Sequence, residues 1–188
     1  MLAPTLIKAS PRIFLGPTPD LLRIPPDATV ISLVETTKRY PGQLCLPLVD
    51  TLSPSGVPDR AQLEAFLGEA HAAVERGPTY WHCRRGINRS GLALAAYLHL
   101  YGRQSITAAV ARLRRLRSPV VLQNETFVAA LDAWYRGPDE APIERVDMEA
   151  VARALGVAVV PRHLRQPLPM PDGEGSVDPI ELRLDDSA

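Results

Sequence analysis

The sequence predicts an α/β fold in which helices flank a central, largely parallel sheet of four to five strands. Short segments rich in apolar and β-branched residues are followed by segments with helical periodicity, an alternation that favours parallel strands. Apolar residues make up 46% and charged residues 22% of the 188 residues, so the chain can bury a core without disulfides or metal. This composition excludes disordered, collagen-like and coiled-coil proteins.

Four short strands are expected in the first half of the chain. Their residues are largely apolar or β-branched, and Pro or Gly lies close to each of them: residues 12–16, 29–34, 44–49 and 79–82. Pro47 has no N–H to donate to a ladder. It therefore marks the end of the third strand or a strand at the edge of the sheet.

Helical segments with clear start and stop signals accompany these strands. The first covers residues 58–76, with Pro58 in its first turn and Gly77 after its end. Three more helices are expected over residues 89–101, 105–116 and 123–135. Ser105 is the expected cap at the start of the second of these three helices.

The composition changes after Gly137. A short helix is expected over residues 147–155, and residues 157–160 are expected to form one more strand. The residues that follow are rich in Pro, Gly and acidic side chains, which is typical of a loosely packed segment. We therefore expect one folded domain over residues 1–137 and an acidic, Pro-rich C-terminal extension over residues 138–188.

No segment of the sequence has the length and apolarity of a membrane span. The longest apolar stretch, residues 92–100, is about half as long as the ~20 residues that a membrane-spanning helix needs. The first residues of the chain hold no apolar block of signal-peptide length. We expect a cytoplasmic protein without a membrane span.

The charges are unevenly distributed although they sum to zero. Residues 76–124 contain nine Arg and no Asp or Glu, whereas residues 137–188 carry eleven acidic and five basic residues. The middle of the chain is therefore suited to bind an anion. One hypothesis is that the acidic extension folds back over this basic region as an internal brake. Four arginines form either a solvated helix face or part of the positive field around a substrate: Arg112, Arg114, Arg115 and Arg117.

The segment Trp81–Gly91, WHCRRGINRSG, carries the residues with clear chemical uses. Backbone N–H groups of a loop at a helix N-terminus converge on one point and favour a negative charge there. Gly86 permits a backbone conformation that a side chain would hinder. Arg89 can hold two oxygens of a tetrahedral anion in a bidentate contact. The same positive field stabilises a thiolate, the nucleophilic form of Cys83.

This segment resembles the signature of cysteine-dependent protein tyrosine phosphatases, His-Cys-x5-Arg-Ser. The matching positions are His82, Cys83, Arg89 and Ser90. Short strands before the signature and a helical segment after it resemble the dual-specificity branch of that superfamily. The resemblance spans about residues 10–136, which implies a protein tyrosine phosphatase-like fold and a dual-specificity phosphatase-like catalytic domain within residues 1–137.

The resemblance also implies a role for each residue of the site. Cys83 attacks phosphorus, Asp50 protonates the leaving oxygen, and Ser90 hydrogen-bonds the sulfur. Arg89 and the loop amides hold the phosphoryl oxygens, and His82 orients the loop. The substrate-binding loop comprises Arg84, Arg85, Gly86, Ile87, Asn88 and Arg89. No metal and no cofactor is expected, and Asp59 is the alternative to Asp50 as the acid.

The implied function is hydrolysis of phosphate monoesters through a phosphocysteine, on proteins that carry phosphotyrosine, phosphoserine or phosphothreonine. The partner is therefore a phosphorylated protein or another phosphoanion. The alternatives are a phosphatase of RNA 5′-triphosphates or phosphoinositides, a rhodanese-type sulfurtransferase, and a catalytically silent phosphate-binding module. The five residues between Cys83 and Arg89 favour phosphate over the tighter rhodanese loop. Nucleic acid is not the favoured partner, because the chain has no basic stripe interleaved with aromatic residues.

Several polar residues receive a structural interpretation. Cys45 is expected to be a small buried hydrophobe, the alternative being a protective disulfide with Cys83. Gln123 and Asn124 lie where the family often has a polar residue near the active site, and we interpret them as helix caps. Three histidines lack metal-ligand spacing and are taken as structural or surface residues: His71, His99 and His163.

Overall fold

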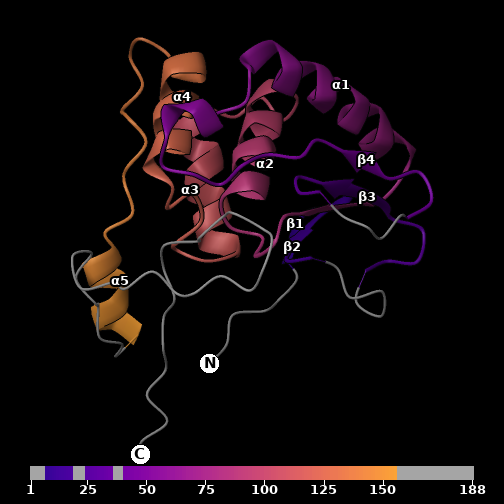
Figure 1. Cartoon of the computed structure of the whole chain (residues 1–188), viewed down its shortest axis with the longest axis horizontal. Helices are drawn as coiled ribbons and strands as arrows, with labels where there is room; N and C mark the ends of the chain where they lie inside the picture. The colour runs from indigo at the N-terminus through magenta and orange to yellow at the C-terminus, as the bar shows by residue number, and fades with distance from the viewer. Residues whose placement is uncertain (1–6, 19–23, 36–39, 156–188) are drawn as a thin grey trace, which may run out of the picture.

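The computed structural model describes residues 7–18, 24–35 and 40–155 (Figure 1). Within them, one five-stranded sheet has the order β1-β2-β5-β3-β4. Its strands are β1 (Ile7–Ser10), β2 (Ile13–Gly16), β3 (Thr29–Ser32), β4 (Leu44–Cys45) and β5 (Thr79–His82). Four of the strands pair in parallel, which confirms the predicted α/β fold with a largely parallel sheet.

One strand was absent from the sequence prediction. β1 pairs antiparallel with β2 as a hairpin, with Ile7 opposite Leu15. The hairpin turn contains Pro11, and the β1 sequence IKAS holds a single β-branched residue. Its strand conformation depends on the partner strand rather than on local propensity, so the sequence pattern did not reveal it.

The helices lie close to their predicted positions. They are α1 (Arg60–Arg76), α2 (Arg89–Leu100), α3 (Ile106–Leu116), α4 (Glu125–Tyr135) and α5 (Met148–Leu155), with a short 3-10 turn at Pro54–Gly56. Ser105 caps α3, as predicted, by accepting a hydrogen bond from the Ala108 N–H. Asp59 is the N-cap of α1 and accepts from the Gln62 N–H at 3.0 Å. Across the described ranges, none of these helices combines the length and apolarity needed to cross a bilayer.

The third predicted strand is shorter than expected because Pro47 interrupts it. β4 ends at Cys45, yet the chain continues alongside β3 through two further backbone hydrogen bonds. The Leu46 N–H donates to the Ser32 carbonyl at 2.9 Å, and the Leu48 N–H donates to the Leu33 carbonyl at 3.1 Å. Pro47 has no N–H to donate. This pairing carries the chain past the end of β3 and delivers Asp50 to that edge of the sheet.

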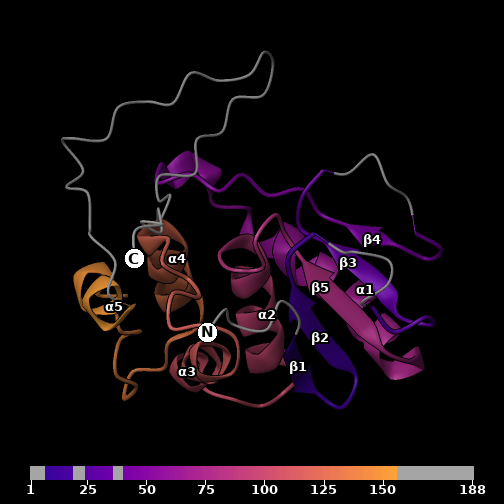
Figure 2. The same ribbon diagram turned by 90° about the horizontal axis from the view of Figure 1, so that it is seen from below.

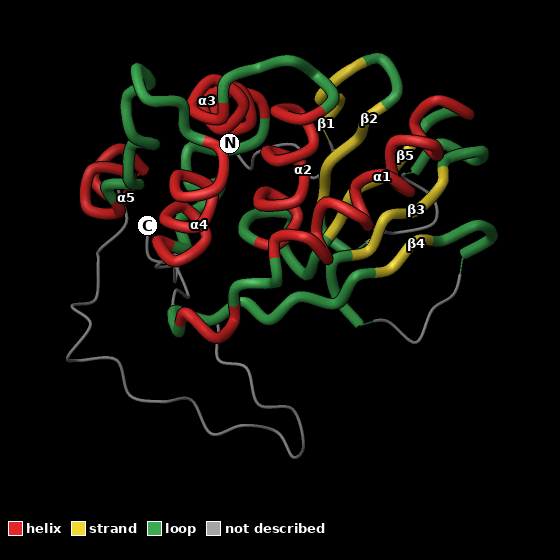
Figure 3. The backbone as a smooth tube through the Cα atoms, turned by 90° about the horizontal axis from the view of Figure 1, so that it is seen from above, coloured by secondary structure: helices red, strands yellow, loops and turns green. Residues whose placement is uncertain are grey.

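The core lies between the sheet and the helices on one of its faces. Leu15, Trp81 and Ile31 stand side by side on β2, β5 and β3, and each is fully buried. They belong to one cluster that includes Leu63 of α1 and Leu92 of α2. Figure 2 and Figure 3 show the helices α1 and α2 against this sheet, α3 beside α2 near β1, and α4 farther out beside α2.

The parallel strands end together at one edge of the sheet. Gly16, Ser32 and His82 occupy the same register at the ends of β2, β3 and β5. In α/β sheets, ligands bind at the carboxyl ends of the strands. Cys83 follows β5 at this edge, and Asp50 reaches the same edge from β4.

Residues beyond Gly137 make specific contacts with the domain. Ile143 is 4% exposed, and its N–H donates to the Asp132 side chain at 3.1 Å. The Thr107 hydroxyl donates to the Ala141 carbonyl at 2.8 Å. The division into a domain over residues 1–137 and an extension over residues 138–188 stays a prediction. Ile143 and Ala141, which make these contacts, belong to the predicted extension. The expected strand at residues 157–160 and the internal brake fall outside the described residues.

Glu140 ties this segment to the start of α3. It accepts hydrogen bonds from the Thr107 N–H at 2.8 Å and from the Gly137 N–H at 3.3 Å. Burial by itself would raise the pKa of Glu140. The hydrogen bonds at the start of α3 outweigh burial and lower the pKa from 4.5 to about 2.

We therefore expect Glu140→Ala to lower the free energy of unfolding by about 1–2 kcal/mol at neutral pH. A lowered folded-state pKa contributes stability that is present above 4.5 and lost as the pH falls towards about 2. Denaturant unfolding at several pH values should show the difference between wild type and variant shrinking over that range. Asp139→Ala, at an exposed neighbouring carboxylate, is the control and should change little.

Candidate active site

The loop between β5 and α2 is fixed by a glycine. Gly86 has φ +68°, in the left-handed region, and a Cβ at this position would lie 2.3 Å from the Gly16 carbonyl oxygen at the end of β2. Both the backbone conformation and the close approach therefore require glycine. The Thr18 N–H donates to the Arg84 carbonyl at 3.3 Å and holds the loop from the same side.

α2 begins at this loop without a side-chain cap. Asn88 occupies the N-cap position, but its side chain makes no hydrogen bond to the first turn of the helix. The N–H groups at the start of a helix have no partner within the helix. An uncapped N-terminus with a positive dipole end suits an anion, as the sequence predicted for this segment.

Cys83 and Ser90 are in contact beneath this loop. The Ser90 hydroxyl donates to the Cys83 sulfur at 3.3 Å, and both residues are buried. Ser90 lies in the first turn of α2, so the sulfur sits against the start of that helix. A hydroxyl donor and a helix N-terminus are surroundings in which nucleophilic cysteines occur.

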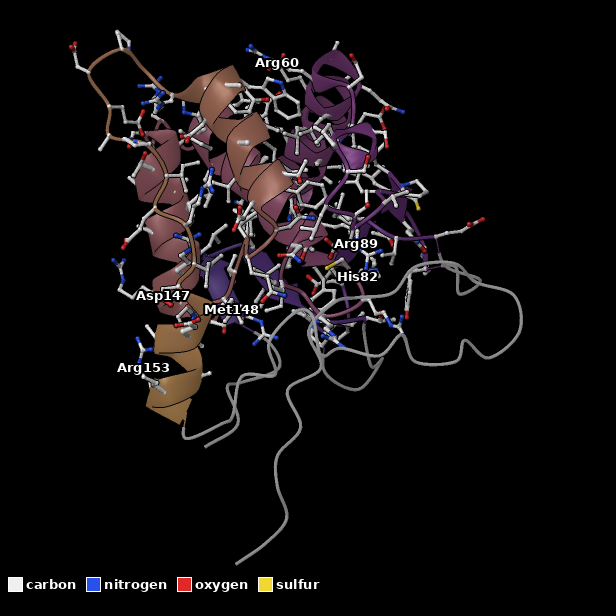
Figure 4. All side chains as sticks on the ribbon, turned by 60° about the vertical axis from the view of Figure 1, so that its left-hand side comes forward. Arg60, His82, Arg89, Asp147, Met148 and Arg153 are labelled. Atoms are coloured by element: carbon white, nitrogen blue, oxygen red, sulfur yellow. The ribbon has the colours of Figure 1, made fainter. Side chains whose placement is uncertain are left out.

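Arg89 and Asp50 meet at the same edge of the sheet. The Arg89 Nε atom lies 3.9 Å from Asp50 Oδ2, and the side chains are 14% and 9% exposed. Arg89 Nε is buried and has no hydrogen-bond partner among the described residues, which leaves it available to an oxyanion. Figure 4 shows His82 and Arg89, which flank the loop, in one region of the molecule, away from Arg153 on α5.

Asp50 is held by two amide side chains. Asn88 Nδ2 donates to both carboxylate oxygens, at 3.3 and 3.1 Å, and Asn124 Nδ2 donates to Oδ1 at 2.8 Å. Asn124 also caps α4, as the sequence indicated. Its contact with Asp50 was missed, because it joins residues 74 positions apart and the only local signal at Asn124 is that of a cap. The rival acid Asp59 caps α1, and no described contact links it to this cluster.

His82 is fully buried on the sheet face opposite Trp81. Burial lowers its pKa from 6.5 to about 4, and the backbone of Cys83 partly opposes this shift, so the ring is neutral near pH 7. Neither ring nitrogen forms a hydrogen bond with the described residues. The ring stacks on Tyr80, with centroids 5.9 Å apart. The predicted role of His82 in orienting the loop would therefore act through packing.

The arginines near the loop divide into two groups. Arg84 and Arg85 are exposed in the loop itself. Arg112, Arg114 and Arg117 are partly buried and donate to backbone carbonyls: those of Ala9, Val121, Leu122, Glu144 and Arg85. Of the two alternatives given for the four arginines of residues 112–117, a wholly solvated face does not hold, because only Arg115 of the four is exposed.

Cys45 is exposed, which corrects the expectation of a buried cysteine. Cys45 of β4 pairs in register with Ser32 of β3. Ser32 pairs on its other side with His82 of β5. Neighbouring strands lie about 4.8 Å apart, so Cys45 and His82 are separated by about 10 Å, and Cys83 lies one residue farther on. A disulfide needs Cα atoms within about 7 Å. A Cys45–Cys83 disulfide would therefore require backbone movement.

The same architecture occurs in solved phosphatase structures. A mouse protein named as a dual specificity phosphatase, solved in complex with zinc tungstate, is 25% identical to this chain. Its TM-score is 0.59, over 71% of this chain and 88% of that chain. Human DUSP28 is also 25% identical, with a TM-score of 0.58 over 71% of this chain and 95% of that one. In its fold and in its signature residues, the chain resembles the dual-specificity branch of the cysteine-dependent protein tyrosine phosphatase superfamily.

A phosphatase of lower sequence identity shares the fold of this chain. Tk-PTP in its active form is 19% identical, with a TM-score of 0.55 over 69% of this chain and 95% of that chain. No family model and no curated protein sequence matches the chain. The resemblance to these phosphatases therefore rests on the three-dimensional arrangement together with the signature residues.

Proposed function

We propose that this dual-specificity-like phosphatase hydrolyses phosphate monoesters through a phosphocysteine on Cys83. One observation carries the proposal: the buried sulfur of Cys83 accepts a hydrogen bond from Ser90 in the first turn of α2, and Arg89 and Asp50 meet beside the same loop. A nucleophile, an oxyanion clamp and an acid are the parts that this reaction needs.

In the first step, the Cys83 thiolate attacks the phosphorus of the monoester. The S–P bond forms as the bond to the leaving oxygen breaks, and Asp50 in its protonated form gives that oxygen its proton. The products are a free alcohol or phenol, the phosphocysteine and the Asp50 carboxylate. Arg89 and the loop N–H groups hold the equatorial oxygens while their charge redistributes.

In the second step, a water molecule attacks the phosphocysteine. Asp50 takes a proton from this water as its oxygen bonds to phosphorus, and the S–P bond breaks. The Cys83 thiolate leaves with the help of the Ser90 hydroxyl, which donates to the sulfur at 3.3 Å. Inorganic phosphate is released, and Asp50 is again protonated for the next turnover.

Phosphorylated proteins are the proposed substrates. Val49 and Leu52, close to Asp50 on either side, are apolar side chains that are 58% and 43% exposed. Apolar groups beside the acid suit contact with the side chains of a phosphopeptide better than contact with a purely polyanionic ligand. The similarity to proteins named as dual specificity phosphatases supports the same substrate class, phosphotyrosine together with phosphoserine and phosphothreonine.

The proposal is tested with the full chain in EDTA. We expect hydrolysis of p-nitrophenyl phosphate, and a kcat/KM for phosphotyrosine and phosphothreonine peptides at least about tenfold above that for an inositol phosphate or a 5′-triphosphorylated RNA. A folded protein that hydrolyses none of these would refute the catalytic proposal. Preference for the inositol phosphate or the RNA would leave the chemistry standing and overturn the choice of protein substrates.

A further inference from the structure

The orientation of the Asn88 amide is fixed by a backbone donor. The N–H of Asn124 donates to Asn88 Oδ1 at 3.3 Å. A backbone N–H can only donate, so the atom that faces it must be the amide oxygen. Asn88 Nδ2 therefore faces Asp50, 3.3 and 3.1 Å from its two oxygens. Asn88 is 5% exposed, and the reverse orientation would leave buried groups unpaired.

The Asn124 amide is fixed in the same way. Its Oδ1 accepts from the N–H groups of Thr126 and Phe127, at 3.0 and 3.4 Å, in the first turn of α4. Its Nδ2 must then face the other side, where it donates to Asp50 Oδ1 at 2.8 Å and to the Thr51 carbonyl at 3.0 Å. One side chain thus caps a helix and binds the acid.

The start of α4 also holds the segment that follows Asp50. The Thr126 hydroxyl donates to the Leu52 carbonyl at 2.9 Å, next to the bond from Asn124 to the Thr51 carbonyl. Three consecutive residues of this segment, 50–52, are therefore each bonded to the first residues of α4 or to its cap. The acid is anchored to a helix that is distant in sequence, in addition to its own strand.

The two oxygens of Asp50 have different surroundings. Oδ1 accepts the shortest bond, from Asn124, and a longer one from Asn88. Oδ2 accepts only from Asn88 among the described residues and is the oxygen that faces Arg89, at 3.9 Å. Because the guanidinium marks where the phosphoryl oxygens bind, Oδ2 is the oxygen on the substrate side.

We infer that Asn124 is a positioning residue for the general acid. By occupying Oδ1, it leaves Oδ2 as the atom that carries the proton and delivers it to the leaving oxygen. This inference rests on the proposed role of Asp50. Of the residues assigned to the reaction, the Asn124 side chain is hydrogen-bonded to Asp50, so its effect on catalysis is expected to pass through Asp50.

The chemistry predicts a specific signature for such a residue. A general acid matters most when the leaving group is a poor one, because a good leaving group departs without a proton. Loss of Asn124 should therefore slow the hydrolysis of phenyl phosphate much more than that of p-nitrophenyl phosphate. A residue that only caps α4 would affect stability and would show no such dependence on the leaving group.

Asn124→Ser separates the two roles of this side chain. Serine caps a helix about as well as asparagine, but its shorter side chain does not reach Asp50. We expect kcat/KM, which reports the first step, to fall roughly 10- to 100-fold for phenyl phosphate and less than about threefold for p-nitrophenyl phosphate. The thermal midpoint should stay near that of the wild type. Ser105→Ala is the matched control, since it removes a cap from α3 and should show no selectivity for the leaving group.

Asp50→Asn in the same assays separates the possible outcomes. If wild type hydrolyses neither ester, the proposed function itself fails, and if Asp50→Asn is not selective for the leaving group, the acid assignment fails. Either result also overturns the inference about Asn124. If Asp50→Asn is selective and Asn124→Ser is not, the proposed function stands and the inference alone is wrong. If Asp50→Asn and Asn124→Ser are both selective for the leaving group and Ser105→Ala is not, the inference about Asn124 is supported.

Discussion

Cys83→Ser is expected to reduce the hydrolysis of p-nitrophenyl phosphate to background, a loss on the order of 10⁴-fold or more in kcat. The serine hydroxyl is a far weaker nucleophile than a thiolate, and in the first step Asp50 acts as the acid, so it is not available to take the proton of the hydroxyl. The surroundings of the sulfur, a helix N-terminus and the Ser90 hydroxyl, stabilise an anion but do not remove a proton from an alcohol. The fold should persist, because serine is slightly smaller than the cysteine it replaces.

The second cysteine of the chain provides the control. Cys45 is exposed, and within the described part of the chain its sulfur donates to the Val34 carbonyl, at 3.5 Å. Cys45→Ser should keep wild-type activity and stability. If Cys83→Ser retained a tenth of the wild-type rate while Cys45→Ser lost activity, the assignment of the nucleophile would be wrong. Measurement of kcat and thermal unfolding for both variants decides between these results.

The predictable parts of this fold are those whose signals are local. Ser105 precedes a periodic apolar segment, and the α3 helix that it caps begins where the sequence indicated. The segment from β5 through the loop to α2 was also identified correctly, because the strand, the glycine and the helix start are adjacent in sequence. Each of these features depends on neighbours a few residues away, and a sequence pattern contains that information.

The unpredicted parts depend on partners far away in the chain. Arg112 was interpreted through its charge, but it donates to the Ala9 carbonyl, 103 positions away. Asn124 was interpreted as a cap, and its second bond reaches Asp50 across 74 positions. A side chain with two functional groups can satisfy a local and a distant partner at once. The sequence shows only the local one, so the arrangement around the acid required the three-dimensional structure.

Gly86→Ala is expected to destabilise the domain by about 3 kcal/mol and to lower kcat as well. Two causes add at this position. The alanine must adopt φ +68°, and its Cβ would lie 2.3 Å from the Gly16 carbonyl oxygen, which is backbone and cannot swing aside. The loop must therefore move away from β2. Because the same loop carries the N–H groups that would hold the phosphoryl oxygens, its movement should affect turnover and not stability alone.

Gly42→Ala isolates the first of these causes. Gly42 has nearly the same φ, +67°, but a Cβ there would meet nothing within 4 Å. This variant should lower the free energy of unfolding by about 1 kcal/mol, because alanine must adopt a left-handed backbone conformation, and it should leave kcat unchanged. Denaturant unfolding and steady-state kinetics of the two variants measure the difference. Equal losses of stability would mean that the contact between the loop and the end of β2 is not tight, and unchanged turnover in Gly86→Ala would mean that the loop geometry does not limit catalysis.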